Sequence, residues 1–365
     1  MTGIYIHVPF CKRKCPYCDF YSVCRPDLYD DYTQAVCRNI QAFRGRGIKC
    51  DTIYFGGGTP SVLSAEQVDR IIDTAGKCFD LCDPEITLEA NPSSADRDKM
   101  SGWRKAGVTR LSFGVQSADD RELGFLGRLH DFAQAEGVVE AAACEGFQHI
   151  SCDVMLGVKG QTLESLQNSI ERLTTLPVDH ISAYMLKIEK GTAFDCEEMR
   201  KSVADDDMLC DMYLQTVKQL EGKGFLQYEI SNFAKEGGKS RHNLKYWHGE
   251  EYIGIGPSAH SYFEGVRYFC KGDIDAFIAD KLQSRTVLEE NPDKAEEYVM
   301  LGLRLTEGID IRKAEQLGGS ELGRNIRKKA ELFQKQGLCV VDKDNLRLTP
   351  EGFLASNSII GELLW

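Results

Sequence analysis

Three cysteines stand close together near the start of the chain, at Cys11, Cys15 and Cys18 in "CKRKCPYC". Thiolates are soft ligands that suit zinc and iron–sulfur clusters. Structural zinc usually takes four ligands, and the chain has no second close pair of cysteines or histidines to complete such a set. Simple packing of buried thiols is disfavoured by the charged residues between them. The spacing therefore predicts a [4Fe-4S] cluster in which one iron keeps no protein ligand.

The elements that must position these cysteines follow a repeating order of strand and helix. Helical segments such as 64–79 alternate with apolar runs, and Ser64 and Gln67 have the spacing of a capping box. Strands separated by whole helices indicate parallel pairing, in either an open doubly wound sheet or a barrel. The pattern predicts an α/β fold with six strands, at 3–8, 51–57, 85–90, 109–115, 149–156 and 180–186.

The rhythm changes after the sixth strand, which divides the chain into three regions. Residues 1–190 carry the strand and helix repeats, 191–290 form a connecting region wrapped on them, and 291–365 form a C-terminal domain. In the connecting region we expect an acidic helix at 203–222 and a strand at 225–231, before a Gly- and aromatic-rich stretch. The C-terminal pattern of helices, a hairpin and a last helix is typical of a winged helix.

Composition limits the partners and the compartment. The net charge of −12 argues against nucleic acid as a partner, because phosphate binding needs clustered Lys and Arg. No apolar run approaches the length of a transmembrane segment, and "MTGIYIHVPF" contains no cationic leader. Fourteen cysteines in a chain of this kind fit a reducing compartment better than a disulfide framework. We therefore expect a cytoplasmic protein.

Several further motifs lie at or near the ends of the predicted strands: "YIHVPFC", "YFGGGTPS", "EANP", "SFGVQS", "GR" at 127–128, "DVMLGVKGQT" and "GIGPSAHSY". With the cysteine spacing, they resemble the radical S-adenosylmethionine (SAM) superfamily and, within it, the oxygen-independent coproporphyrinogen III oxidase-like family, over nearly the whole chain. The resemblance implies an incomplete (β/α)6 TIM-like barrel followed by a smaller, mostly helical, winged-helix-like domain. It also implies that SAM chelates the open iron and that an electron donor is needed if SAM is cleaved.

The same resemblance implies a set of residues that contact SAM, each placed where an α/β fold collects ligands. Gly57, Gly58 and Thr59 would lie against the amino-acid end of SAM. Arg128 suits a carboxylate, which an arginine can bind through paired hydrogen bonds. The other implied contacts are Tyr5, Tyr17, Glu89, Gln116, Arg128 and Asp153.

One departure separates two branches of this family. The true oxidases carry a fourth cysteine where this chain has Phe20. This difference points to the sister branch of haem chaperones of the HemW type, which also shows the stretch found here as "HNLKYW". By resemblance His242, Tyr246 and Trp247 in that stretch bind haem, since imidazole is a good axial ligand and the aromatic rings offer flat faces. His260 in "GPSAHSY" is a second candidate.

Two functions therefore compete. The first is a haem chaperone that binds a [4Fe-4S] cluster, SAM and haem or another porphyrin, and transfers haem to an acceptor protein. The second is an oxygen-independent coproporphyrinogen III oxidase, which decarboxylates its substrate to protoporphyrinogen IX by radical chemistry. Phe20 favours the first. A zinc-dependent interaction module is a third class, and it lacks a fourth ligand.

Overall fold

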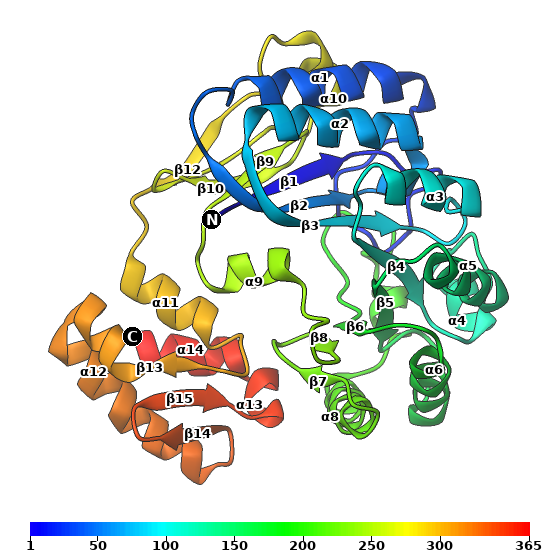
Figure 1. Ribbon diagram of the computed structural model, residues 1–365. Coiled ribbons are helices and arrows are strands. Elements are labelled where there is room, and N and C mark those ends of the chain that lie inside the picture. The colour runs from blue at the N-terminus through cyan, green and yellow to red at the C-terminus, as the bar shows by residue number, and fades with distance from the viewer.

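The structure is a computed structural model that describes all 365 residues. Six parallel strands form one curved sheet, and helices cover its outer face (Figure 1). The strands are β1 (Thr2–Val8), β2 (Lys49–Gly57), β3 (Asp80–Ala90), β4 (Arg110–Gln116), β5 (His149–Leu156) and β6 (His180–Met185). The helices between them are α1 (Tyr29–Gln41), α2 (Ala65–Cys78), α3 (Arg97–Lys105), α4 (Asp120–Phe125), α5 (Phe132–Cys144) and α6 (Leu163–Thr175). All six predicted strands are present, and Ser64 caps α2 with the expected capping box.

The sheet is an incomplete barrel, as the resemblance implies. The strands β1 to β6 pair in chain order, but β1 and β6 do not pair with each other. On its other side β1 pairs with β9 (Tyr252–Ile255), and β6 pairs with β8 (Asn232–Ala234). The barrel is therefore not closed between the side of β1 and the side of β6.

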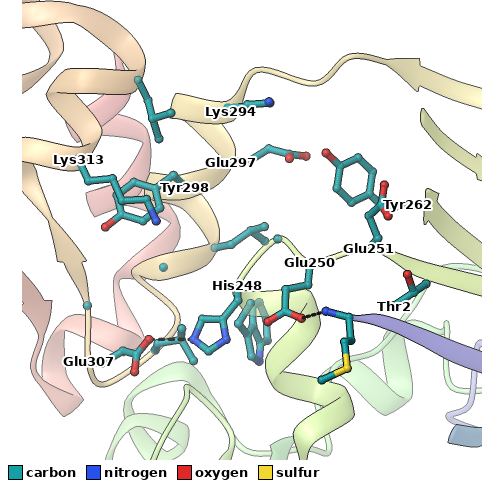
Figure 2. A pocket seen from close by; sticks show the side chains of 18 residues that line it. Thr2, His248, Glu250, Glu251, Tyr262, Lys294, Glu297, Tyr298, Glu307 and Lys313 are labelled. Carbon is teal, nitrogen blue, oxygen red and sulfur yellow. Dashed lines mark hydrogen bonds and ion pairs between the residues drawn. The ribbon is translucent and has the colours of Figure 1, made fainter. Parts of the chain in front are cut away.

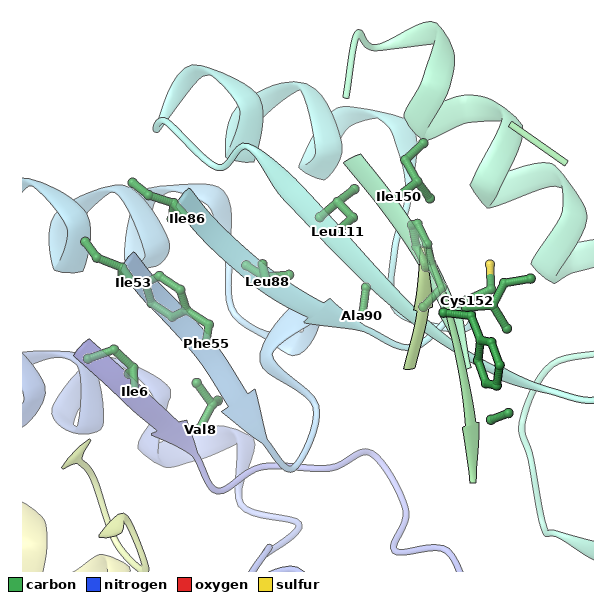
Figure 3. Close-up of a cluster of buried hydrophobic side chains, with 14 of the residues drawn as sticks. Ile6, Val8, Ile53, Phe55, Ile86, Leu88, Ala90, Leu111, Ile150 and Cys152 are labelled. Carbon is green, nitrogen blue, oxygen red and sulfur yellow. The ribbon is translucent and has the colours of Figure 1, made fainter. Parts of the chain in front are cut away.

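The six strands alternate strictly between an apolar and a polar face. Ile4, Ile6 and Val8 of β1 are fully buried on the helix side, and Figure 3 shows Ile53 and Phe55 of β2 on that same side. The intervening positions carry polar or aromatic side chains that face the barrel interior. The register aligns these across the sheet as Tyr5, Tyr54, Thr87 and Arg110, and as Glu89, Ser112 and Ser151. Parallel strands buried on both faces are usually apolar throughout, so this alternation marks a polar interior.

The connecting region differs from the sequence expectation. Helix α8 (Asp206–Gly222) forms as predicted, but the expected strand at 225–231 is reduced to β7 (Leu226–Gln227). Part of the stretch expected as a wrapped connection instead extends the sheet with short strands, and a two-residue turn joins two of them. Glu264 and Gly265 both have positive φ, of 53° and 73°, and form one such hairpin turn. The remaining elements of this region are α7 (Glu197–Arg200), α9 (Arg241–Trp247), β10 (His260–Phe263), β11 (Val266–Phe269), α10 (Ile274–Ala279) and β12 (Thr286–Glu290).

The C-terminal elements build a separate three-stranded sheet flanked by helices, consistent with the expected winged-helix-like arrangement. They are α11 (Lys294–Gly302), β13 (Ile309–Asp310), α12 (Ile311–Lys335), β14 (Cys339–Asp342), β15 (Asn345–Leu348), α13 (Pro350–Leu354) and α14 (Ser356–Leu364). Helix α12 is kinked at Gly319. Figure 1 shows α11 beside α9, between this sheet and the barrel. None of the helices combines the length and the apolar composition needed to cross a membrane.

Candidate functional site

The three predicted cluster cysteines lie on one irregular loop that follows β1. Backbone hydrogen bonds close this loop, from Cys11 N–H to Val23 O at 3.1 Å and from Val23 N–H to Pro9 O at 2.8 Å. Each of the three thiols is partly exposed and none is in a disulfide. No group of three His, Cys, Asp or Glu side chains is gathered closely enough to hold a single metal ion. A four-iron cluster takes its thiolates on different iron atoms, so its ligands stand farther apart than those of one ion.

Two hydrogen-bond donors from other parts of the barrel point at these sulfurs. The Thr59 hydroxyl donates to Cys11 Sγ at 3.4 Å, and Arg128 Nη1 lies 3.6 Å from Cys15 Sγ. Two of the three sulfurs therefore already have a hydrogen-bond donor from a distant part of the chain.

Gly57 and Gly58 let the end of β2 approach β1 and the cysteine loop. A side chain at Gly57, where φ is +108°, would place its Cβ 2.6 Å from the His7 ring. At Gly58 the Cβ would lie 2.7 Å from Phe10 O. The glycines are thus required by contacts within the chain, and their predicted contact with SAM stays a prediction.

Two of the predicted carboxylates face the barrel interior and share one small polar cavity with Tyr54 and Tyr184. Glu89 accepts hydrogen bonds from Tyr54 OH at 2.8 Å and from Gly57 N–H at 3.2 Å. Burial raises the pKa of Glu89 to about 7. Burial likewise raises the pKa of Asp153 to about 6. Buried carboxylates with raised pKa values are common at functional sites.

Gln116 and Arg128 have buried polar atoms without partners. Gln116, at the end of β4, is 7% exposed and has a φ of +79°, a conformation that few residues other than glycine adopt. Its side-chain Oε1 has no hydrogen-bond partner, and neither does Arg128 Nε. Buried polar atoms are nearly always paired in folded proteins, so these two atoms leave one acceptor and one donor open to a polar partner at this end of the barrel.

The remaining predicted SAM contacts lie on either side of these groups. Tyr17 lies 3.5 Å from Arg128 Nη1 through its hydroxyl and contacts Phe194 through its ring. Tyr5 lies inside the barrel, stacked on Tyr54 with ring centroids 6.1 Å apart. The structure therefore brings the SAM candidates to the interior and the cysteine end of the barrel, with Tyr5 farther along the wall of β1.

The three predicted haem residues do not share one surface. The His242 ring is completely buried, with Nδ1 2.8 Å from Thr52 Oγ1 and Nε2 2.9 Å from Tyr246 OH. Burial lowers the pKa of His242 to about 3. Tyr246 lines a cavity beside the cysteine loop, whereas Trp247 lines a different cavity, on the side of α11. Coordination of iron by His242 would require this ring to leave both of its hydrogen bonds.

The cavity that contains Trp247 has a volume of about 850 Å³ and lies between α9, β10 and the C-terminal domain (Figure 2). Some of its charged side chains are paired, since His248 Nε2 lies 2.8 Å from Glu307 and Glu250 lies 3.9 Å from the amino terminus. Figure 2 shows these two pairs along one wall. The cavity therefore has a lining of mixed charge and polarity.

Sequence reasoning missed several interior residues. His7 lies two residues after Tyr5 on the same strand face, and that alternation was a usable signal. It accepts from Tyr5 OH at 3.1 Å and donates to Tyr21 O at 3.0 Å. Glu85 and Arg110 form an ion pair of 3.1 Å in which both side chains are almost fully buried. No local sequence pattern could have predicted this ion pair, because Glu85 and Arg110 lie on different strands and are far apart in the chain.

The Glu85 and Arg110 pair holds α9 at the inner end of the barrel. The second carboxylate oxygen of Glu85 accepts from the backbone N–H of Arg241 at 2.9 Å and of His242 at 3.3 Å. A carboxylate at a helix N-terminus is favoured by the free N–H groups there. Arg110 also donates to Gly238 O at 2.9 Å. These bonds fix the start of the helix that carries "HNLKYW".

Comparisons with known proteins agree with this geometry. The profile of the radical SAM superfamily matches residues 5–173, and that of the HemN C-terminal domain matches residues 290–355. A protein named heme chaperone HemW from Bacillus subtilis (strain 168) is 34% identical, covering 100% of this chain and 99% of its own length. A HemW protein of Haemophilus influenzae is also 34% identical, covering 98% and 96%. The solved structure of Escherichia coli coproporphyrinogen III oxidase HemN, at 21% identity, covers 100% of this chain and 90% of its own with a TM-score of 0.83, which shows the same fold.

Proposed function

This chain belongs to the HemW family of the radical SAM superfamily, and on that premise we propose that it binds haem and transfers it to an acceptor protein. In this proposal Cys11, Cys15 and Cys18 hold a [4Fe-4S] cluster, and SAM binds beside it. A reducing compartment such as the cytoplasm keeps the fourteen free thiols and the cluster intact. The division at about 190 and 290 into barrel, connecting region and C-terminal domain is part of the same proposal.

The residues present fit both cofactors. The three cysteines are partly exposed, and two of them receive hydrogen bonds, Cys11 from Thr59 and Cys15 from Arg128. The unpaired atoms of Gln116 and Arg128 lie where SAM would supply polar partners. When bound and reduced, the cluster and SAM together provide a source of radical chemistry. In our proposal Glu89 and Asp153, in the polar interior, hold the hydroxyl and amino groups of SAM.

One observation carries the choice of a chaperone over an oxidase. The cysteine loop offers three thiols, and at the position of a fourth in the oxidases Phe20 stands with 59% of its surface exposed. The chain also aligns end to end with proteins named heme chaperones. A phenyl ring cannot replace a thiolate as a metal ligand, so the loop has an apolar side chain at the place of the fourth thiol.

The test uses one preparation of the full chain, reconstituted with iron and sulfide without oxygen. Haem is titrated into it while the Soret band is recorded, and a second portion is incubated with SAM, a reductant and coproporphyrinogen III. We expect stoichiometric haem binding and no protoporphyrinogen IX on chromatography. Protoporphyrinogen IX as a product, or no haem binding at all, would overturn the proposal.

A further inference from the structure

Six of the seven histidines are already occupied by partners within the chain. Both ring nitrogens are hydrogen-bonded in His7, His180 and His242. One ring nitrogen is hydrogen-bonded in each of His130, His149 and His248. His260 is the exception, because neither of its ring nitrogens has a hydrogen-bond partner. An imidazole without partners is free to bind a metal.

His260 lines a cavity of about 380 Å³ beside the cysteine loop. The rest of the wall is rich in aromatic rings, contributed by Tyr5, Phe20, Tyr21, Tyr246 and Tyr252. Ligand pockets in proteins span about 300 to 1,000 Å³, so this cavity lies at the small end of that range. It would hold one part of a large flat ligand and leave the remainder exposed.

The position of the His260 ring is well defined. His260 is the first residue of β10 and pairs with Phe269 of β11. Its ring stacks on Phe269 with centroids 5.4 Å apart and planes 19° apart. Partial burial lowers the pKa of His260, which keeps the imidazole neutral and able to donate its electron pair. His260 is nevertheless an exposed residue and lines the cavity.

His242 and His260 differ in their relation to this cavity. His242 does not line it, but it stacks on Tyr5 with centroids 6.4 Å apart and is hydrogen-bonded to Tyr246, and both of these tyrosines do line the cavity. His260 lines the cavity itself. The first shapes the wall, and the second faces whatever the wall binds.

We propose that His260 is the axial ligand of haem iron, with one face or edge of the porphyrin seated on this aromatic wall next to Phe20. This inference rests on the proposed function and names the haem site within it. A coordinate bond forms from a ring nitrogen of His260 to the iron, a solvent ligand leaves the iron, and no electron is transferred. Partial exposure of the porphyrin suits a protein that must release it.

The test titrates ferric and ferrous haem into the full-length wild type and the variants His260→Ala, His242→Ala and His248→Ala. We expect His260→Ala to shift the Soret band and weaken haem binding at least tenfold. His248→Ala, an exposed histidine at the other cavity, should leave both unchanged. Imidazole in millimolar amounts should restore the wild-type spectrum to His260→Ala, which a merely structural defect would not allow.

The outcomes separate the two proposals. If the wild type binds no haem, the proposed function fails and the site fails with it. If the wild type binds haem and His260→Ala keeps the same spectrum and affinity, the site assignment alone is overturned. A spectrum lost in His242→Ala and kept in His260→Ala would likewise overturn it and return the ligand to "HNLKYW".

Discussion

The two ends of the barrel interior use the same kinds of side chain in opposite ways. At the inner end Glu85, Arg110 and His180 are buried, and each has at least one hydrogen-bond partner from another segment. At the cysteine end, thiols are half-exposed and His260 has no partner at all. The difference teaches that buried side chains bonded to distant segments build the framework, even where one atom such as Arg110 Nη1 has no partner, whereas the exposed and half-exposed side chains of the cysteine end are open to ligands.

The largest expected effect lies at the cysteine end. Cys15→Ala removes a proposed cluster ligand, so we expect the reconstituted protein to lose the four-iron absorbance and its bound iron, while its melting temperature stays within a few degrees. Cys144→Ala, at an exposed cysteine on α5, is the matched control and should keep the cluster. A full four-iron spectrum in Cys15→Ala would contradict the ligand assignment.

The inner end should respond in the opposite sense, with a loss of stability and no loss of iron. Arg110→Met leaves the Glu85 carboxylate buried without its partner, which costs about 3 to 5 kcal/mol in the free energy of unfolding. Urea denaturation measures this change.

Two controls accompany that measurement. The double variant Glu85→Gln with Arg110→Met should recover part of the loss, because no charge is then left buried. Arg121→Ala breaks an exposed pair with Asp119 and should cost less than about 1 kcal/mol. An Arg110→Met protein as stable as the wild type would show that the pair does not support the framework.

His242 gives a smaller effect of the same kind. His242→Ala leaves Thr52 and Tyr246 without their hydrogen bonds and opens space behind Tyr5, so we expect a loss of about 2 to 3 kcal/mol. The affinity of the purified variant for haem should stay within twofold of the wild type. A stable variant that no longer binds haem would reverse the comparison between the two ends.

The smallest effect is a dependence of stability on pH. Burial, together with the nearby Arg110, lowers the pKa of His180 to about 3 in the folded protein, against 6.5 for an exposed histidine. The unfolded chain therefore binds the extra proton first, and stability is lost as the pH falls below 6.5.

By pH 5 this loss amounts to about 1 to 2 kcal/mol from His180 alone. Urea denaturation of the wild type and of His180→Gln at pH 7 and pH 5 isolates this contribution, because all other groups are common to both proteins. The difference in stability between the two proteins should narrow toward pH 5. If the free energy of unfolding changed equally with pH in both proteins, His180 would be excluded as the titrating group.

Much of the framework was predictable because it depends on local pattern. The six strands, α8 and the capping box at Ser64 follow from apolar periodicity and capping residues that lie within a few positions of one another. The strands β9 to β12 were missed because each has four or five residues and little apolar alternation. Only the turn at Glu264 and Gly265 marked a hairpin there.

The site was predictable in its residues and not in their partners. Cysteine spacing placed three thiols on one loop, but the distant donors Thr59 and Arg128 come to them only through the fold. The same limit applies to Arg110, whose carbonyl partner Gly238 lies 128 residues away. The choice between His242 and His260 depends on which imidazole ring has hydrogen-bond partners in the folded chain. Residue types alone do not contain that information.

The alternation of the barrel strands has a consequence for any insertion or deletion. Side chains of a strand change faces at every residue, so a shift of β1 by one position would send Tyr5 and His7 into the apolar layer beneath the helices. Ile4 and Ile6 would then face the polar interior. Substitutions at the inward-facing positions of a strand can therefore remodel the interior while the packing under the helices stays intact. An inserted or deleted residue within a strand would instead exchange the inward-facing and outward-facing side chains beyond it.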